Sequence, residues 1–326
     1  MKTHSILSLV LSCAGILPLP LGGEGWGEGA SAPPSSSPDF QPKTLSLEPA
    51  STIDPTNKFA FGANIGWIDW RADGSSGAVI GEFVCSGYLY AANVGWINLG
   101  SGAPADGVRY RNNSATDFGV NHDTLGNLRG CAYGANVGWL NFTNRDATGA
   151  SYDGPKVDLL TGRISGYVWS ANCGWISLSN AQGFVQTGSI SSGNDSDHDG
   201  IPDAWELLHF GNLTTANGTT DFDHDGFTDL QEYLADTDPA RADSNLRITS
   251  ASFGSHGTDV TISWNSRPGR FYQILERSSL DDGFTWTDAG LGLLAPEPGD
   301  LTTRTFLEQP ASSRFFQIKA VRPLLR

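Results

Sequence analysis

The sequence predicts a mainly β protein of several domains, and three observations lead to this prediction. The 326 residues include 40 glycines but only 17% charged residues, a composition typical of turns and short strands. A motif built around Gly-Trp recurs four times between residues 57 and 186. Residues 245–326 contain short runs of alternating apolar and polar residues, which indicate strands. A chain of this length has room for two or three domains.

The amino terminus, residues 1–32, is predicted to be an export signal. Lys2 supplies a positive charge ahead of a mostly apolar stretch, and residues 30–32 fit a small-x-small cleavage site. Lipoprotein processing at Cys13 is the alternative. Residues 33–56 are rich in Pro and Ser and are expected to form a linker. No later stretch reaches the roughly 18 apolar residues of a membrane helix, so we expect a secreted or cell-surface protein.

The β-repeat domain is predicted to span residues 57–186. Its four copies share the pattern aromatic-x-Ala-Asn-x-Gly-Trp-(Ile/Leu) and begin at Phe61, Tyr90, Tyr133 and Trp169. Asn and Gly readily adopt the left-handed backbone that a turn demands. Each copy is therefore expected to form strands on either side of a turn, and neighbouring copies would complete a shared core.

Two interpretations are open for the recurring tryptophans, which are Trp67, Trp96, Trp139 and Trp175. Apolar residues flank each of them directly, which favours a place in the core of the repeat domain. Alternatively, rings exposed in a row would stack on sugars. In that case the repeat domain would be a carbohydrate-binding module that uses its repeated aromatic side chains.

Composition and motifs argue against two other classes of function. The net charge is −15, but residues 195–243 alone contain thirteen Asp or Glu and one Arg, so the rest of the chain is close to neutral. This distribution disfavours nucleic-acid binding, which requires a basic face. No nucleophile elbow, HExxH or phosphate-binding loop occurs, and the histidines are scattered, so we expect no enzymatic activity.

The cysteines and His122 are expected to have structural roles. If Cys13 leaves with the export signal, Cys85, Cys131 and Cys173 remain, and three cysteines allow at most one internal disulfide. None of the three lies in a CxxC motif or next to a histidine, which favours small buried residues in strands. His122 lies in a turn-rich stretch and is expected in a loop.

We call residues 195–243 the acidic segment. Two twelve-residue stretches within it match the pattern D-x-D-x-D-G-(apolar)-x-D-x-x-E without a mismatch. They span residues 195–206 and 221–232. Calcium is a hard cation that takes six to eight oxygen ligands, and this spacing brings the carboxylates of loop positions 1, 3 and 5 to one point. Position 6 must turn sharply, which Gly200 and Gly226 allow.

The sequence therefore predicts two calcium sites. Position 7 offers a backbone carbonyl, position 9 commonly acts through a water, and position 12 supplies a bidentate carboxylate. The predicted ligands are Asp195, Asp197, Asp199, Ile201, Asp203 and Glu206 in the first loop, and Asp221, Asp223, Asp225, Phe227, Asp229 and Glu232 in the second. The side chains of Ile201 and Phe227 are expected to pack together between the loops. His198 and His224 occupy position 4 and are expected to face solvent.

A short helix is predicted after each loop, over residues 203–210 and 229–235, but none before the first loop, where residues 187–194 read as a linker. These loop-plus-helix units, with Trp205-Glu206-Leu207-Leu208 and Leu230-Gln231-Glu232-Tyr233, resemble thrombospondin type 3-like and dockerin-like calcium repeats of bacterial secreted proteins. The acidic segment lacks the cysteines of animal thrombospondin-type repeats. It also lacks the small polar residues with which dockerins bind a cohesin.

The C-terminal domain is predicted to span residues 245–326 and to be a small β-sandwich. Strands are expected at residues 246–253, 259–265, 271–277, 285–288, 302–306 and 314–321. Six short strands in about eighty residues suit an immunoglobulin-like or fibronectin type III-like sandwich. The segments Ile262-Ser263-Trp264 and Phe315-Phe316-Gln317-Ile318 resemble C-terminal sandwich domains of bacterial secreted multi-domain proteins.

These features together predict an exported calcium-binding protein with a structural or adhesive role, in which calcium orders a connector between two β domains. The alternatives are the carbohydrate-binding cell-surface module and a non-catalytic accessory part of an extracellular enzyme system. The expected partners are calcium and either a cell-surface polysaccharide or another surface protein. Ten ligand carboxylates would repel one another without the ion, so the acidic segment is expected to be loose without calcium and compact with it.

Overall fold

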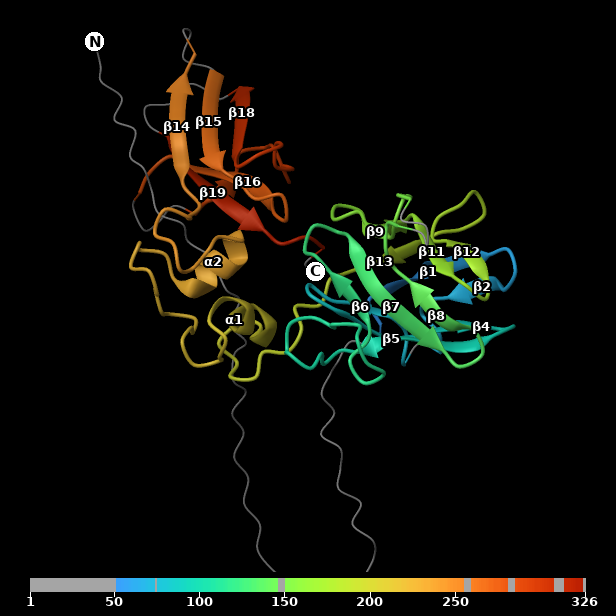
Figure 1. The fold of residues 1–326 in the computed structure, drawn as a ribbon. Helices are drawn as coiled ribbons and strands as arrows, with labels where there is room; N and C mark the ends of the chain where they lie inside the picture. Colours follow the sequence, from blue (N-terminus) through green and yellow to red (C-terminus); the bar gives the residue numbers. More distant parts are fainter. Residues whose placement is uncertain are drawn as a thin grey trace, which may run out of the picture.

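The computed structural model describes residues 51–73, 75–145, 150–254, 259–280, 285–307 and 314–324. The predicted export signal, Cys13 and residues 33–50 of the predicted linker lie outside these ranges. The described residues form nineteen strands and two short helices, so the prediction of a mainly β protein is confirmed. Figure 1 shows two β-rich bodies, with both helices below the C-terminal body and beside the N-terminal one.

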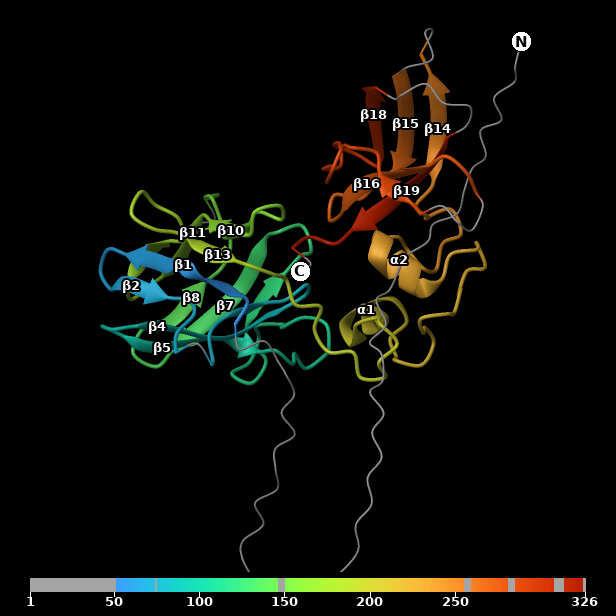
Figure 2. The ribbon, with the colours of Figure 1, turned by 180° about the vertical axis from the view of Figure 1, so that it is seen from behind.

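Eight strands of the N-terminal body close into a barrel. They form four antiparallel hairpins that pair side by side, and the last strand pairs back onto the first. The hairpins are β1 (Ile53–Gly62) with β2 (Gly66–Asp69), β4 (Cys85–Ala91) with β5 (Gly95–Ser101), β7 (Leu128–Gly134) with β8 (Gly138–Asn141), and β11 (Tyr167–Ser170) with β12 (Gly174–Ser177). Each hairpin is one copy of the sequence repeat, so four copies build one closed sheet, seen from behind in Figure 2.

Five shorter strands flank the barrel: β3 (Val79–Ile80), β6 (Val120–His122), β9 (Lys156–Val157), β10 (Arg163–Ser165) and β13 (Val185–Thr187). Strand β13 pairs with the first half of β1, which begins at Ile53, so residues 53–56 belong to this domain and not to the predicted linker. The predicted linker at residues 187–194 is also held to the barrel. The Gly188 amide donates to the Thr52 carbonyl at 2.8 Å, and Ile190 is buried in the barrel core.

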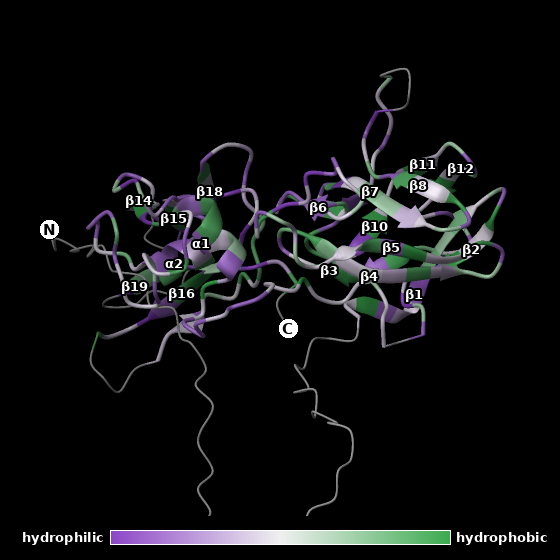
Figure 3. Ribbon diagram, turned by 60° about the horizontal axis from the view of Figure 1, so that its bottom comes forward, coloured by the Kyte–Doolittle hydropathy of each residue, from purple (hydrophilic) through white to green (hydrophobic). Residues whose placement is uncertain are grey.

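Alternation along each hairpin decides which side chains enter the barrel. The residue after each recurring Trp is at most 1% exposed; these residues are Ile68, Ile97, Leu140 and Ile176. Because successive side chains of a strand face opposite sides of the sheet, each preceding Trp must point outward. Figure 3 shows the corresponding alternation of hydrophobic and hydrophilic residues along the barrel strands.

The expectation that the tryptophans form the core of the repeat domain is therefore wrong. Trp67, Trp96, Trp139 and Trp175 are 41 to 48% exposed. Each ring packs against a cross-strand aromatic partner at 4.9 to 5.1 Å between centroids; the partners are Phe61, Tyr90, Tyr133 and Trp169. A third ring lies beside each pair, from Phe59, Tyr88, Phe118 or Tyr152. We call these rings on the outer face of the barrel the aromatic belt.

The recurring Asn ties each hairpin to the previous one. Asn93, for example, donates from its side chain to the carbonyl of Ile65 in the preceding copy, at 3.1 Å. The other three bonds run from Asn136 to Val94, from Asn172 to Val137, and from Asn64 back to Cys173, so the four bonds form a closed cycle at the turn end of the barrel. The Gly of each turn adopts a left-handed backbone, with φ of +79° at Gly66. Asn and Gly of the motif are therefore structural.

The C-terminal body consists of two three-stranded antiparallel sheets. One contains β14 (Ile248–Phe253), β15 (Asp259–Asn265) and β18 (Leu301–Leu307), and the other contains β17 (Thr287–Asp288), β16 (Phe271–Arg277) and β19 (Phe315–Val321). Residues from both sheets, including Trp264, Ile274 and Ile318, share one core. All six predicted strands are present, and the bounds of β15 and β16 agree with the prediction.

The acidic segment carries the two helices, α1 (Asp203–His209) and α2 (Asp229–Ala235), each of seven residues. Helix α2 starts with a reciprocal cap, in which the Thr228 hydroxyl accepts from the Gln231 amide and the Gln231 side chain accepts from the Thr228 amide. Of the helices in the described ranges, neither has the length and apolar character needed to cross a membrane.

The acidic segment is compact and contacts both β domains. Ile201, Trp205 and Tyr233 form a buried cluster with Phe83 of the barrel domain. On the other side, Ala235 belongs to the core of the C-terminal domain, and Phe227 packs against that core. The predicted connector is therefore held between the domains through apolar contacts with each of them.

Candidate metal centre

The two predicted loops each gather three carboxylates. Asp195, Asp197 and Asp199 offer oxygen atoms that all lie within 4.8 Å of one another, and Asp221, Asp223 and Asp225 do the same. Each loop therefore brings together the carboxylates of positions 1, 3 and 5, as the sequence pattern predicted. An acidic cluster alone does not identify a metal site, so the remaining positions of each loop decide what the cluster can do.

The first Asp of each loop also organises the backbone. Asp195 accepts hydrogen bonds from the amides of Asp199 at 3.2 Å and Gly200 at 3.1 Å. The second loop repeats this arrangement, with the Gly226 amide 3.0 Å from Asp221 Oδ2. The φ angles of Gly200 and Gly226 are +94° and +96°, in the left-handed region where glycine is favoured. The sharp turn predicted at position 6 is therefore present in both loops.

Position 9 closes each loop onto its own beginning. Asp203 accepts from the Ser196 amide at 2.7 Å, and Asp229 accepts from the Phe222 amide at 3.2 Å. These carboxylates are occupied by protein donors, which agrees with a role through a bridging water rather than direct ligation. His198 and His224, at position 4, are exposed, as predicted.

Position 12 holds the most informative residues of both loops. Glu206 is 0% exposed, and neither of its carboxylate oxygens has a hydrogen-bond partner among the described residues. Glu232 is 1% exposed; its Oε1 accepts from Thr237 Oγ1 at 3.2 Å, and its Oε2 has no partner in the described chain. Asp199 Oδ2 and Asp223 Oδ2 are likewise buried and without a partner there.

Burial and neighbouring acids favour the protonated form of Glu206 and Glu232. Burial, followed by the charge of Asp197, raises the pKa of Glu206 to about 7. Burial, followed by the charge of Asp223, raises the pKa of Glu232 to about 8. Burial also raises the pKa of Asp199 and of Asp223.

A buried carboxylate without a donor is costly, so nearly all such groups in proteins have partners. Among the described residues, none of the ion pairs includes a carboxylate of either loop. The three aspartates of each loop converge, and buried oxygens without a donor in the described chain accompany them: both of Glu206, Oδ2 of Asp199 and Asp223, and Oε2 of Glu232. Such oxygens are the ligands that a hard cation requires. The residues of both loops therefore fit a divalent metal ion.

The apolar residues at position 7 differ from the prediction. Ile201 is fully buried in the cluster shared with the barrel domain, whereas Phe227 packs against the core of the C-terminal domain. The two side chains therefore belong to separate clusters and do not form the predicted bridge between the loops. The reason is that each loop has a different β domain as its neighbour.

Sequence reasoning missed a buried ionic network one residue beyond the second loop. Glu82 of the barrel domain accepts from Tyr233 Oη at 2.8 Å and lies 2.7 Å from Arg322 Nη2 and 3.4 Å from Arg270 Nη2. Arg270 is 2% exposed and also donates to the carbonyls of Tyr233 and Leu234, at 2.8 and 2.9 Å. One carboxylate therefore joins the barrel, helix α2 and the C-terminal domain. The partners of Glu82 lie 151 to 240 positions away in the chain, so no local pattern indicates them.

The cysteines and His122 occupy positions inside the barrel domain. His122 lies in strand β6 and is 1% exposed, with Nδ1 2.9 Å from the Gly81 carbonyl, so the prediction of a loop position is wrong. Burial lowers the pKa of His122. Cys85, Cys131 and Cys173 are free thiols; Cys85 and Cys173 are buried and Cys131 is half-buried.

The evidence for a metal centre in this chain is the geometry of the two loops. Its strongest features are the three converging aspartates in each loop and the buried, donor-free Glu206. A search with protein-family models, a search of curated proteins and a search of solved structures each returned no match to this chain.

Proposed function

We propose that the acidic segment binds two calcium ions and that these ions hold the barrel domain and the C-terminal domain in a fixed arrangement. The observation that carries this proposal is the burial of Glu206 with both carboxylate oxygens unpartnered in the described residues, beside three converging aspartates. A cation bound by these residues would supply the missing partner for the two oxygens of Glu206 and for Asp199 Oδ2.

Calcium suits these loops better than other common metals. All side-chain donors are carboxylates, and neither Cys nor His is among the predicted ligands, which disfavours zinc and copper. Magnesium demands a nearly ideal octahedral shell and dehydrates reluctantly, whereas calcium accepts six to eight oxygens, including a bidentate Glu. The resemblance to thrombospondin type 3-like and dockerin-like repeats also supports calcium.

The structural role follows from what each loop contacts. Ile201 of the first loop packs with Phe83 of the barrel domain, and Phe227 of the second loop packs against the C-terminal core. Glu232 is followed directly by Tyr233, whose hydroxyl binds Glu82. Ordering of the loops by calcium would therefore order the contacts of both domains. We also propose that the C-terminal domain is a fibronectin type III-like sandwich and that the chain is exported.

Isothermal titration of the full-length chain with calcium, and separately with magnesium, tests this proposal. The wild type is expected to bind two calcium ions per chain, with much weaker binding of magnesium. Glu206→Gln and Glu232→Gln should each abolish one site, because position 12 supplies the bidentate ligand. Asp243→Asn is the matched control, since Asp243 is an exposed acid of the same segment that pairs with Arg241. Absence of calcium binding at millimolar concentration would contradict the proposal.

A further inference from the structure

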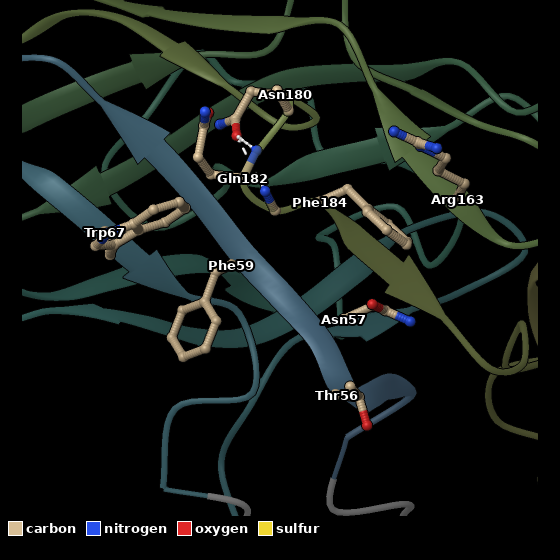
Figure 4. Close-up of a pocket in the computed structure, with 10 residues that line it drawn as sticks. Thr56, Asn57, Phe59, Trp67, Arg163, Asn180, Gln182 and Phe184 are labelled. Atoms are coloured by element: carbon tan, nitrogen blue, oxygen red, sulfur yellow. Dashed lines mark hydrogen bonds between the residues drawn. The ribbon is translucent and has the colours of Figure 1, made fainter.

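The barrel domain has a pocket of about 590 Å³ at the point where the closed sheet meets strand β13. It lies between strand β1 and the β12–β13 connection, shown in Figure 4. The other three hairpins carry the same Trp and aromatic partner. At the first hairpin, however, the β12–β13 connection folds over the ring of Trp67, so that a Cβ added at Gly183 would lie 3.4 Å from it. The pocket therefore adds a second wall to one part of the aromatic belt.

Three aromatic rings contribute to the walls of this pocket. Phe59 and Trp67 are 37% and 44% exposed and pack edge to face, with ring centroids 6.2 Å apart. Phe184 lies across strand β1 from them in Figure 4. Exposed rings that have an apolar face and are fixed by packing are suited to stack on a flat, partly apolar ligand.

The polar side chains of the pocket offer hydrogen-bond donors without protein partners. Asn180 Oδ1 accepts from the backbone amides of Gln182 and Gly183, at 2.9 and 3.0 Å, which fixes the side chain. Within the described part of the chain, neither the Asn180 Nδ2 group nor the side-chain amide of Gln182 has a hydrogen-bond partner. Asn180 can donate from Nδ2, and the Gln182 amide can both donate and accept, so they match a ligand that carries many hydroxyl groups.

The pocket also contains one cation and no anion. The Arg163 guanidinium lies over the Phe184 ring, 4.3 Å from its centroid, and donates to Ser179 Oγ. No ion pair of Arg163 exists among the described residues, and no Asp or Glu lines the pocket. Arg163 is therefore held in place with its charge available to a carboxylate.

We propose that this pocket binds a carboxylated oligosaccharide of the uronic-acid type. Its rings would stack on Trp67 and Phe59, its hydroxyls would bond the amides of Asn180 and Gln182, and its carboxylate would pair with Arg163. A purely apolar ligand would leave the polar groups unpaired, and a neutral sugar would not use the charge of Arg163. The proposal is independent of calcium binding, because all of these residues belong to the barrel domain.

Calorimetric titration of the full-length chain with two probes tests this inference. The probes are a hexamer of galacturonic acid and a hexamer of β-1,4-linked glucose, which share length but differ in charge. The acidic hexamer should bind saturably, and the neutral hexamer should bind at least about tenfold more weakly, as expected for loss of one charge-assisted pair. Absence of saturable binding of the acidic hexamer at millimolar concentration would overturn the proposal.

Two tryptophan variants test whether the ligand binds in the pocket or elsewhere on the aromatic belt. Trp67→Ala should weaken binding of the acidic hexamer about threefold to tenfold, the range expected for loss of one aromatic contact. Trp96→Ala is the matched control, because Trp96 has the same packing and a similar exposure of 46% on the neighbouring hairpin but lies outside the pocket. Its binding should stay within about twofold of the wild type. Equal weakening of hexamer binding by both variants would show that the sugar binds along the aromatic belt, which would contradict binding in the pocket.

Arg163→Gln tests the charge. It should remove the preference for the acidic hexamer while leaving binding of the neutral hexamer unchanged, and a preference that survives in this variant would contradict the role of Arg163. Thermal unfolding of each variant checks that the barrel is intact. It should be, because Arg163, Trp67 and Trp96 are all exposed and lie outside the apolar core.

Discussion

The barrel domain and the acidic segment satisfy their polar groups in opposite ways. In the barrel, the Asn of each copy bonds to a carbonyl of the preceding copy, and the cycle of four bonds closes within the chain. In the acidic segment, Glu206 is buried with no donor in the described chain. The hydrogen bonds of the first region close within the chain, whereas the second leaves buried carboxylate oxygens without a partner, which under our proposal a bound ion would supply. A protein can thus combine a self-sufficient domain with a segment whose stability is set by its surroundings.

Removal of calcium should produce the largest difference in thermal stability between the acidic segment and the barrel domain. If the proposed sites bind calcium, each ion would stabilise the folded form by about 4 kcal/mol at a concentration a thousandfold above its Kd. A chelator should therefore lower the unfolding temperature of the transition that includes the acidic segment and leave the barrel transition in place. Differential scanning calorimetry of the full-length chain measures both. A single transition that does not respond to chelator or calcium would contradict the comparison.

Glu82→Gln should break the junction at which the two regions meet. Arg322 would lose its acid, and Arg270 would keep only the longer contact with Asp236, at 3.9 Å. Removal of one partner from a buried ion pair typically costs about 3 to 5 kcal/mol. Urea denaturation gives the change in free energy of unfolding. Glu297→Gln is the control, because its pair with Arg304 is half exposed, and such pairs contribute about 0 to 1 kcal/mol. Equal effects of the two variants would show that the network at Glu82 is not a junction.

The pH dependence of stability should distinguish the metal-free acidic segment from the barrel. Glu206 and Glu232 have pKa values of about 7 and 8 in the fold, against an ordinary value of 4.5. The folded form binds more protons, so the stability that these groups contribute is fully present below pH 4.5 and is lost as the pH rises through 7 and 8. Without calcium, the transition of the acidic segment should therefore move to lower temperature between pH 5 and 8.

With saturating calcium this pH dependence should reverse, because the ion requires ionised carboxylates. The barrel transition should behave differently and independently of calcium: it should rise as the pH increases toward 6.5, because burial lowers the pKa of His122 and the unfolded form then binds more protons than the folded one. Thermal unfolding recorded at pH 5, 6, 7 and 8, with calcium and with chelator, provides the measurement. A metal-free stability that increases across this range would be inconsistent with protonated glutamates in the fold.

Asn93→Ala should have the smallest effect and should be independent of calcium. It removes one bond of the cycle, the bond to the Ile65 carbonyl, and a hydrogen bond of this kind contributes about 1 kcal/mol. The barrel transition should fall by the corresponding amount, with and without calcium. Asn113→Ala, at an exposed Asn of the same domain, is expected to leave it unchanged. If the change at Asn93 depended on calcium, the barrel would not be independent of the acidic segment.

Local patterns were sufficient for much of the fold and for the loops. The six predicted strands of the C-terminal domain, helix α2 after the second loop and the strand–turn–strand form of each repeat all occur where the sequence patterns indicated them. The converging aspartates were predictable because twelve consecutive residues fix their own geometry around a Gly turn. The tryptophans were misassigned, because apolar neighbours do not reveal which face of a strand is inside until the register is known.

By itself, the sequence determined the β-rich class, the four-copy repeat and the two acidic loops, all of which depend on residues close together in the chain. Only the tertiary structure decided that the four hairpins close into a barrel, that the Trp rings lie outside it, and that Glu82 meets Tyr233, Arg270 and Arg322. It also decided that Phe184 and Arg163 come to lie near Trp67 and form a pocket. The physical reason is that these contacts join residues that are distant in sequence, and their pairing is set by sheet closure and domain packing.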